Sequence, residues 1–137
     1  MSLAYIDASA LVKLIAEEDE SEALALFLGS AGPLASSILV TVEVARAVSR
    51  VAPDRDDRTT QVVDGVSLIE FNARIAARAA VVRPPTLRTL DAIHLASAME
   101  LGDDLTAFVC YDERLSAAAR ELGLPVVSPS GAVPGRD

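Results

Sequence analysis

The chain has 137 residues, of which half are hydrophobic and fewer than a quarter are charged, so it is not a disordered segment. Its length suits one domain, and its single cysteine, Cys110, excludes an internal disulfide and a cysteine-based metal centre. The net charge of −8 argues against a nucleic-acid binder, because such proteins normally carry a basic surface. That argument weakens if several acids surround bound cations, since the cations reverse the local field.

The sequence contains no signal peptide and no apolar run near the ~20 residues that a membrane span needs. We therefore expect a soluble, cytoplasmic protein that does not associate with a membrane. Cys110 lies in the apolar run 106–111, where a buried structural cysteine is expected.

Short apolar runs alternate with segments of helical periodicity along the whole chain. The apolar runs predict strands at residues 3–7, 34–37, 66–71, 106–111 and 125–128. The periodic segments predict helices at residues 9–18, 20–28, 40–51, 72–82, 90–101 and 112–122, with residues 54–64 partly helical. This alternation predicts a three-layer α/β/α fold around a mainly parallel sheet of four or five strands. Residues 1–137 are expected to form a single domain with a loosely ordered tail at 129–137.

Two aspartates follow predicted strands directly. Asp7 closes the first strand and Asp112 follows the strand at 106–111. Parallel α/β sheets bind ligands beyond the carboxyl ends of their strands, so both positions favour a functional site. Each aspartate is equally suited to capping the helix that follows it. Ser9 is also expected to cap the first helix, or else to hydrogen-bond Asp7 or a water on a metal ion.

Two more acids lie on predicted helices. Glu43 stands at the edge of the apolar stripe of helix 40–51, where the alternative is a surface pair with Arg46. Asp91 lies in the first turn of a helix that is apolar nearly all round. The helix dipole contributes about 0.3–1 kcal/mol there, whereas burying an unpaired carboxylate costs several. We therefore expect a cation close to Asp91.

Asp7, Glu43, Asp91 and Asp112 would repel one another if they met at one edge of the sheet. Two carboxylates at ~5 Å repel by about 3 kcal/mol at an effective dielectric of about 20, which only protonation or a cation relieves. Ligands that are all oxygen select a hard ion, so Mg²⁺ or Mn²⁺ is expected. Carboxylates that share such ions should lie within ~10 Å of one another.

Four segments carrying these acids resemble the motifs of PIN domains, in the same order. They are Asp7-Ala-Ser9, Val42-Glu43-Val-Ala-Arg46, Thr89-Leu-Asp91-Ala-Ile-His-Leu-Ala96 and Val109-Cys-Tyr-Asp112-Glu-Arg-Leu115. The resemblance extends over about residues 3–128. The length of the chain is similar to that of the VapC branch, the toxins of prokaryotic type II toxin–antitoxin pairs.

The resemblance implies a homodimeric, Mg²⁺-dependent endoribonuclease that cuts RNA and is held inactive by a small VapB-like antitoxin. It implies an acidic site with Ser9 assisting. We expect Asp7 and Asp112 to be the firmest metal ligands and Asp91 a direct or water-mediated one. Glu43 would be a further ligand or the base that orients the attacking water.

Five further residues are supporting candidates, each with a structural alternative. Thr89 is expected to cap its helix. His94, one turn after Asp91, is either structural or a contact to the site or substrate. Lys13 would be a solvated lysine or a phosphate contact. Arg46 and Arg50 share one helix face and suit RNA phosphates, an antitoxin or simple solvation.

Three other classes of protein share parts of this pattern. A catalytically silent interaction domain would keep the PIN fold without activity. A phosphatase of the haloacid-dehalogenase type needs a second aspartate two residues after the first, where this chain has Ser9. A receiver-type signalling domain needs a lysine late in the chain, but the sole lysine is Lys13.

Overall fold

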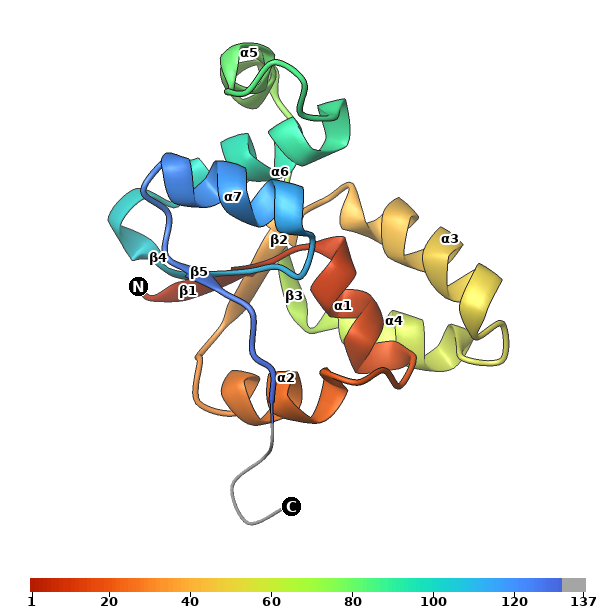
Figure 1. Ribbon diagram of the computed structural model, residues 1–137. Coiled ribbons are helices and arrows are strands. Elements are labelled where there is room, and N and C mark those ends of the chain that lie inside the picture. The colour runs from red at the N-terminus through yellow and green to blue at the C-terminus, as the bar shows by residue number, and fades with distance from the viewer. Residues whose placement is uncertain (132–137) are drawn as a thin grey trace.

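The computed structural model describes residues 1–131 and places a sheet between two layers of helices (Figure 1). In chain order the elements are β1 (Leu3–Ile6), α1 (Ala8–Ile15), α2 (Ser21–Leu28), β2 (Leu34–Ser37), α3 (Val40–Val51), α4 (Asp56–Asp64), β3 (Val66–Ile69), α5 (Ala73–Val81), α6 (Thr89–Met99), η1 (Gly102–Asp104), β4 (Leu105–Val109), α7 (Glu113–Glu121) and β5 (Val126–Val127). The predicted alternation of strands and helices is confirmed.

The sheet has five strands in the order β3-β2-β1-β4-β5, and every neighbouring pair is parallel. The predicted three-layer fold with a parallel sheet of four or five strands is therefore confirmed. β1 is the central strand, and Ile6 at its end is in register with Val109 at the end of β4. Because the two strands are parallel and neighbouring, the segments that follow them leave the sheet at the same edge.

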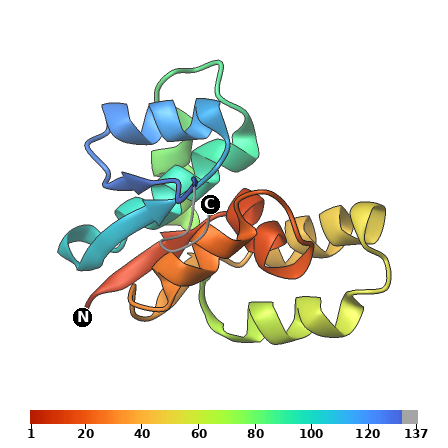
Figure 2. The ribbon, with the colours of Figure 1, turned by 60° about the horizontal axis from the view of Figure 1, so that its bottom comes forward.

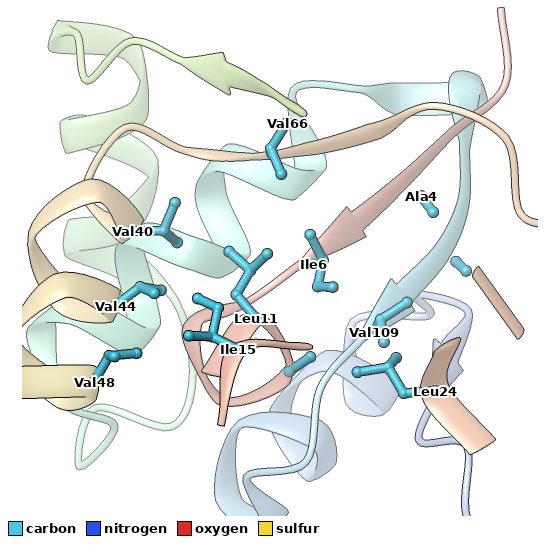
Figure 3. Packing of buried hydrophobic residues seen from close by; sticks show 12 residues of the cluster. Ala4, Ile6, Leu11, Ile15, Leu24, Val40, Val44, Val48, Val66 and Val109 are labelled. Atoms are coloured by element: carbon cyan, nitrogen blue, oxygen red, sulfur yellow. The ribbon is translucent and has the colours of Figure 1, made fainter. Parts of the chain in front are cut away.

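The buried residues on one side of the sheet are all aliphatic (Figure 3). Ile6 of β1 points into this layer, and Figure 2 shows the N-terminal helices on this side of the strands. We call this packing the aliphatic face; its buried members include Ile6, Leu11, Ile15, Leu24, Val40, Val44, Val48, Val66 and Val109.

The opposite side of the sheet is covered by α6 and α7. Successive side chains of a strand point to opposite faces, so Tyr5 points here while its neighbour Ile6 points to the aliphatic face. Tyr5 stacks on Phe108 of β4, with ring centroids 5.3 Å apart and an interplanar angle of 2°. We call this side the tyrosine face; it comprises Tyr5, His94, Leu95, Phe108, Cys110 and Leu115.

Several predicted elements are shorter than expected, among them the strands predicted at 106–111 and 125–128, which end at Val109 and Val127. The first helix was predicted to reach residue 18 but ends at Ile15, because the four acids at 17–20 would place negative charge at the negative end of its dipole. The strand predicted at 66–71 ends at Ile69. Residues 132–137 of the expected loose tail lie outside the described residues.

The burial predicted for two segments is confirmed. Residues 92–98 of α6 are all buried, as expected for a helix that is apolar nearly all round. Cys110 is a buried, free cysteine. Within residues 1–131, no helix combines the length and the apolar character required to cross a membrane.

Candidate active site

Asp7 leaves the end of β1 and caps α1. Its Oδ1 accepts hydrogen bonds from the Ala10 backbone N–H at 3.1 Å and from the Ser9 hydroxyl at 2.7 Å. The residue is only 3% exposed. Burial raises the pKa of the Asp7 carboxyl, and the hydrogen bond from Ser9 offsets part of that rise. Two uncharged hydrogen-bond donors thus hold the Asp7 carboxylate in a buried environment that disfavours its ionised form.

Ser9 does not cap the first helix, so this prediction is wrong. Asp7 takes the capping position, because its side chain reaches the backbone N–H of Ala10 three residues later. Ser9 instead donates its hydroxyl hydrogen to Asp7 and accepts a hydrogen bond from the Tyr111 backbone N–H at 3.0 Å. The expected hydrogen bond between Ser9 and Asp7 is confirmed, and it ties α1 to the segment after β4.

Asp112 caps α7 in the same way that Asp7 caps α1. Its Oδ1 accepts from the Leu115 backbone N–H at 2.9 Å, while its Oδ2 faces the Arg88 guanidinium at 3.4 Å. The capping alternative therefore holds for both aspartates. The cap occupies only one carboxylate oxygen of Asp112, so the other oxygen is available to a cation.

Arg88 is the cation expected near Asp91. Its Nε lies 3.3 Å from Asp91 Oδ2, and its Nη2 lies 3.4 Å from Asp112 Oδ2. One guanidinium thus bridges an acid on α6 and an acid after β4. Arg88 was not predicted as a site residue, although its spacing of three from Asp91 is one at which helical side chains adjoin. Thr89 is an exposed first residue of α6 rather than its cap, so that prediction is wrong; the capping position belongs to Arg88.

Glu43 hydrogen-bonds His94 instead of pairing with Arg46. His94 Nε2 lies 2.7 Å from Glu43 Oε1, so α3 and α6 are joined at this point. The histidine is 2% exposed, and its Nδ1 lies 2.7 Å from the Tyr5 hydroxyl. His94 is therefore both a buried structural residue and a partner of a candidate site acid.

Short contacts link three of the four acids, and helix α6 places the partner of the fourth nearby. Ser9 joins Asp7 to the backbone beside Asp112, and Arg88 joins Asp112 to Asp91. One turn later on the same helix, His94 hydrogen-bonds Glu43, so α6 itself relates this pair to Asp91. Within the described residues, no three acidic, histidine or cysteine side chains are gathered tightly enough to hold a metal ion in common.

Lys13 is not solvated, so that expectation is wrong. Its side chain is 12% exposed, forms ion pairs with Glu18 and Glu20, and lies 4.8 Å from the centre of the Tyr111 ring. Burial lowers the pKa of Lys13, but the hydrogen bond and charge of Glu20 and the charge of Glu18 outweigh it and leave the pKa raised. Burial, together with the charge of Glu20, raises the pKa of Tyr111 to about 12.

Arg46 and Arg50 are exposed on α3 and line one shallow surface hollow. The predicted shared helix face is confirmed. Neither arginine forms an ion pair with any residue in the described part of the chain.

A five-stranded parallel sheet with acids at the ends of two neighbouring strands and on two helices defines the class of protein. The PIN domain family model matches residues 4–121, and the chain belongs to this family. Within it, the chain is similar to ribonuclease VapC47 of Mycobacterium tuberculosis, with 40% identity over 94% of this chain and 98% of the relative. Ribonuclease VapC35 of the same species is 44% identical over 93% of this chain and 98% of the relative.

Solved structures share the fold. A toxin–antitoxin complex from Klebsiella pneumoniae contains a chain that matches with a TM-score of 0.72 and 23% identity, over 94% of this chain and 99% of that one. VapC20 of Mycobacterium tuberculosis, described as a toxin that cleaves the sarcin–ricin loop, matches with a TM-score of 0.69 and 17% identity. That match covers 84% of this chain and 94% of VapC20.

Proposed function

We propose that this protein is a divalent-metal-dependent endoribonuclease that hydrolyses RNA phosphodiesters and acts as the toxin of a toxin–antitoxin module. The relatives named ribonuclease VapC support this activity, because they match more than nine tenths of the chain. One structural observation carries the proposal: short contacts and the Arg88 bridge link Asp7, Asp112 and Asp91, and α6 places the partner of Glu43 one turn from Asp91.

Mg²⁺ or Mn²⁺ suits the donors at this site. The candidate acids offer only carboxylate oxygens, which hard divalent cations prefer. Asp7 is buried and anchored by neutral donors, so added positive charge would stabilise it. Arg88 already places positive charge between Asp91 and Asp112. A divalent cation bound here would neutralise charge on phosphate oxygens and make water more acidic.

No three of these acids are gathered around one point in the described residues, so a bound cation would draw its ligands closer together. We assign Asp7 and Asp112 as the firmest ligands, since a helix cap fixes each carboxylate. Asp91 would bind directly or through water, and Glu43 would be a ligand or orient the attacking water. Arg88 would then leave its two carboxylates. Its side chain is 73% exposed, and its planar guanidinium suits an RNA phosphate.

The proposed toxin also carries basic surface residues suited to binding partners. Arg46 and Arg50 form an exposed basic pair suited to RNA phosphates or to an antitoxin. Lys13 would have to break its ion pairs with Glu18 and Glu20 before it met a phosphate. We further propose a VapB-like antitoxin, a homodimeric assembly and a cytoplasmic location, on the strength of the similarity to VapC proteins.

The experiment that tests the activity uses purified protein and single-stranded or looped RNA. Unstacked bases are accessible to a protein, whereas the grooves of A-form RNA hide them. Cleavage should require Mg²⁺ or Mn²⁺, stop with EDTA and disappear in Asp7→Asn, which keeps the shape of a ligand but loses its charge. Asp57→Asn, an exposed acid on α4, is the matched control and should cut normally. Cleavage that persists in Asp7→Asn would refute the assigned site.

Asp7→Asn must also be shown to fold, and its stability has a predicted dependence on pH. Because burial raises the pKa of Asp7 above 3.8, the folded state binds the proton more tightly than the unfolded chain. The resulting stability is complete below pH 3.8 and is lost as the pH rises through the folded pKa. With EDTA present, the amide should therefore stabilise the fold at about pH 7, and by less near pH 4. A variant that unfolds at neutral pH would mark Asp7 as a structural cap only.

A further inference from the structure

A buried series of hydrogen bonds runs from β2 to Glu43. The Ser37 backbone N–H donates to the Tyr5 hydroxyl oxygen at 3.1 Å, and that hydroxyl lies 2.7 Å from His94 Nδ1. His94 Nε2 in turn lies 2.7 Å from Glu43 Oε1. Tyr5 and His94 are 0% and 2% exposed, so water does not compete for these bonds. The series joins the end of β2, the central strand, α6 and α3.

Two hydrogen-bonding constraints select one tautomer of His94. The Tyr5 oxygen already accepts from the Ser37 N–H. Its own hydrogen points to His94 Nδ1 at 2.7 Å when that nitrogen is unprotonated, and the neighbouring buried Ser36 hydroxyl is then left to donate to the Tyr5 oxygen. At the other end, a carboxylate oxygen at 2.7 Å needs a donor, so His94 Nε2 must carry the hydrogen. Both ends of the ring are satisfied by the same arrangement, a hydrogen on Nε2 and a lone pair on Nδ1.

The rings of the tyrosine face fix the plane of the imidazole. Tyr5 meets His94 edge to face, with centroids 5.9 Å apart and an interplanar angle of 78°. On its other side Tyr5 stacks on Phe108. The Nε2–H therefore points in one direction, toward the partly exposed Glu43 carboxylate, whose side chain is 22% exposed.

We propose that His94 is a positioning residue, which acts through Glu43 and is itself oriented by Tyr5 and the Ser37 backbone. The Nε2–H holds one carboxylate oxygen of Glu43 from the buried side and fixes the direction of the carboxylate. His94 stands three residues after Asp91 on α6, so the same helix sets the positions of two candidate site acids. This role rests on the proposed nuclease function, whereas the tautomer does not.

Two neutral replacements separate the two ends of the imidazole. His94→Gln carries an amide N–H near the place of Nε2, so it keeps a donor for Glu43. His94→Asn is shorter and reaches only the place of Nδ1, so it keeps a partner for Tyr5 but loses Glu43. We expect His94→Asn to lower kcat about 10- to 100-fold with little change in KM, the usual loss for a group that orients a site ligand. His94→Gln should recover most of that loss. Equal losses in the two variants, or none, would overturn the positioning role.

Nitrogen-15 NMR of the imidazole tests the tautomer without any activity. His94 is the only histidine in the chain, so its two ring nitrogens give unambiguous signals in the wild-type protein. The expected spectrum shows a hydrogen on Nε2 and none on Nδ1. A hydrogen on Nδ1 would overturn the inference even if RNA is cleaved. A correct tautomer in a protein that cuts no RNA would instead refute the proposed function and leave the hydrogen-bond series standing.

Discussion

The two sides of the sheet are built from different kinds of interaction. The aliphatic face is packed from residues such as Leu11, Leu24 and Val44, which attract one another without directional preference. The tyrosine face has aromatic rings and a buried histidine joined by hydrogen bonds. Two neighbouring residues of β1 contribute to the two faces: Ile6 packs on the aliphatic face and Tyr5 on the tyrosine face.

This difference suggests that one face mainly stabilises the fold, while the other mainly fixes the positions of particular side chains. Aliphatic packing stabilises the fold in proportion to the area removed from water, and it tolerates exchanges that conserve volume. A hydrogen bond requires particular atoms at particular angles. The tyrosine face can therefore fix where His94 and Glu43 lie, whereas the aliphatic face principally keeps the layers together. Three substitutions test this division.

The largest loss of stability is expected on the aliphatic face. Leu24→Ala removes a fully buried side chain from α2 and should lower the free energy of unfolding by about 2–5 kcal/mol, because it leaves a cavity. Leu26→Ala is the matched control on the same helix; its leucine is 57% exposed, so the change should be small. Urea titration of both variants measures the difference. Similar losses would show that α2 packs differently.

A smaller loss is expected from removing one hydroxyl on the tyrosine face. Tyr5→Phe keeps the ring but leaves the buried Ser37 N–H and His94 Nδ1 without their partner, which should cost about 1–3 kcal/mol. Tyr111→Phe is the control, since its hydroxyl bonds only the Pro129 carbonyl and is partly buried. Denaturant melts should rank the first variant as the less stable. An unchanged Tyr5→Phe would mean that the hydrogen bonds are not needed for this face.

The smallest effect belongs to a contact on the outside of the aliphatic face. Glu20→Gln removes one carboxylate from Lys13, whose side chain is 12% exposed against 30% for Glu20. Partly exposed ion pairs of this kind contribute about 0.2–1 kcal/mol and are screened by salt. Thermal melts of the variant and the wild type should differ slightly at low ionic strength and converge at about 1 M salt. A large, salt-independent loss would place Lys13 in the structural core.

Local patterns predicted the fold and selected the four candidate acids, but they did not predict the contacts between distant segments. Asp7 and Asp112 were found because an acid directly after a buried strand is a local feature. Tyr5 was predicted only as a strand residue, since its partner His94 lies 89 positions away. Arg88 was missed because its bridge to Asp112 depends on how α6 lies against β4, which no periodicity reveals.

Ser9 and Thr89 show a second limit of local patterns. Each is a residue type that commonly caps helices, and each stands near the start of a helix. At the first helix an aspartate two residues earlier takes the position, and at α6 the helix begins at Thr89 itself. The residue types near each helix start thus predicted where the helix begins to within two residues. Which residue occupies the capping position depended on which side chain reaches the backbone N–H groups.

The central strand pairs with a strand from the far end of the chain. Leu3 of β1 is in register with Leu105 of β4, and the Thr106 hydroxyl bonds the Leu3 carbonyl across 103 positions of sequence. During synthesis β1 leaves the ribosome first, yet it must wait for β4 before this pairing can form. Asp7 and Asp112, which follow these two strands, therefore come together only after synthesis has passed Asp112. A nascent chain that lacks β4 contains no complete candidate site.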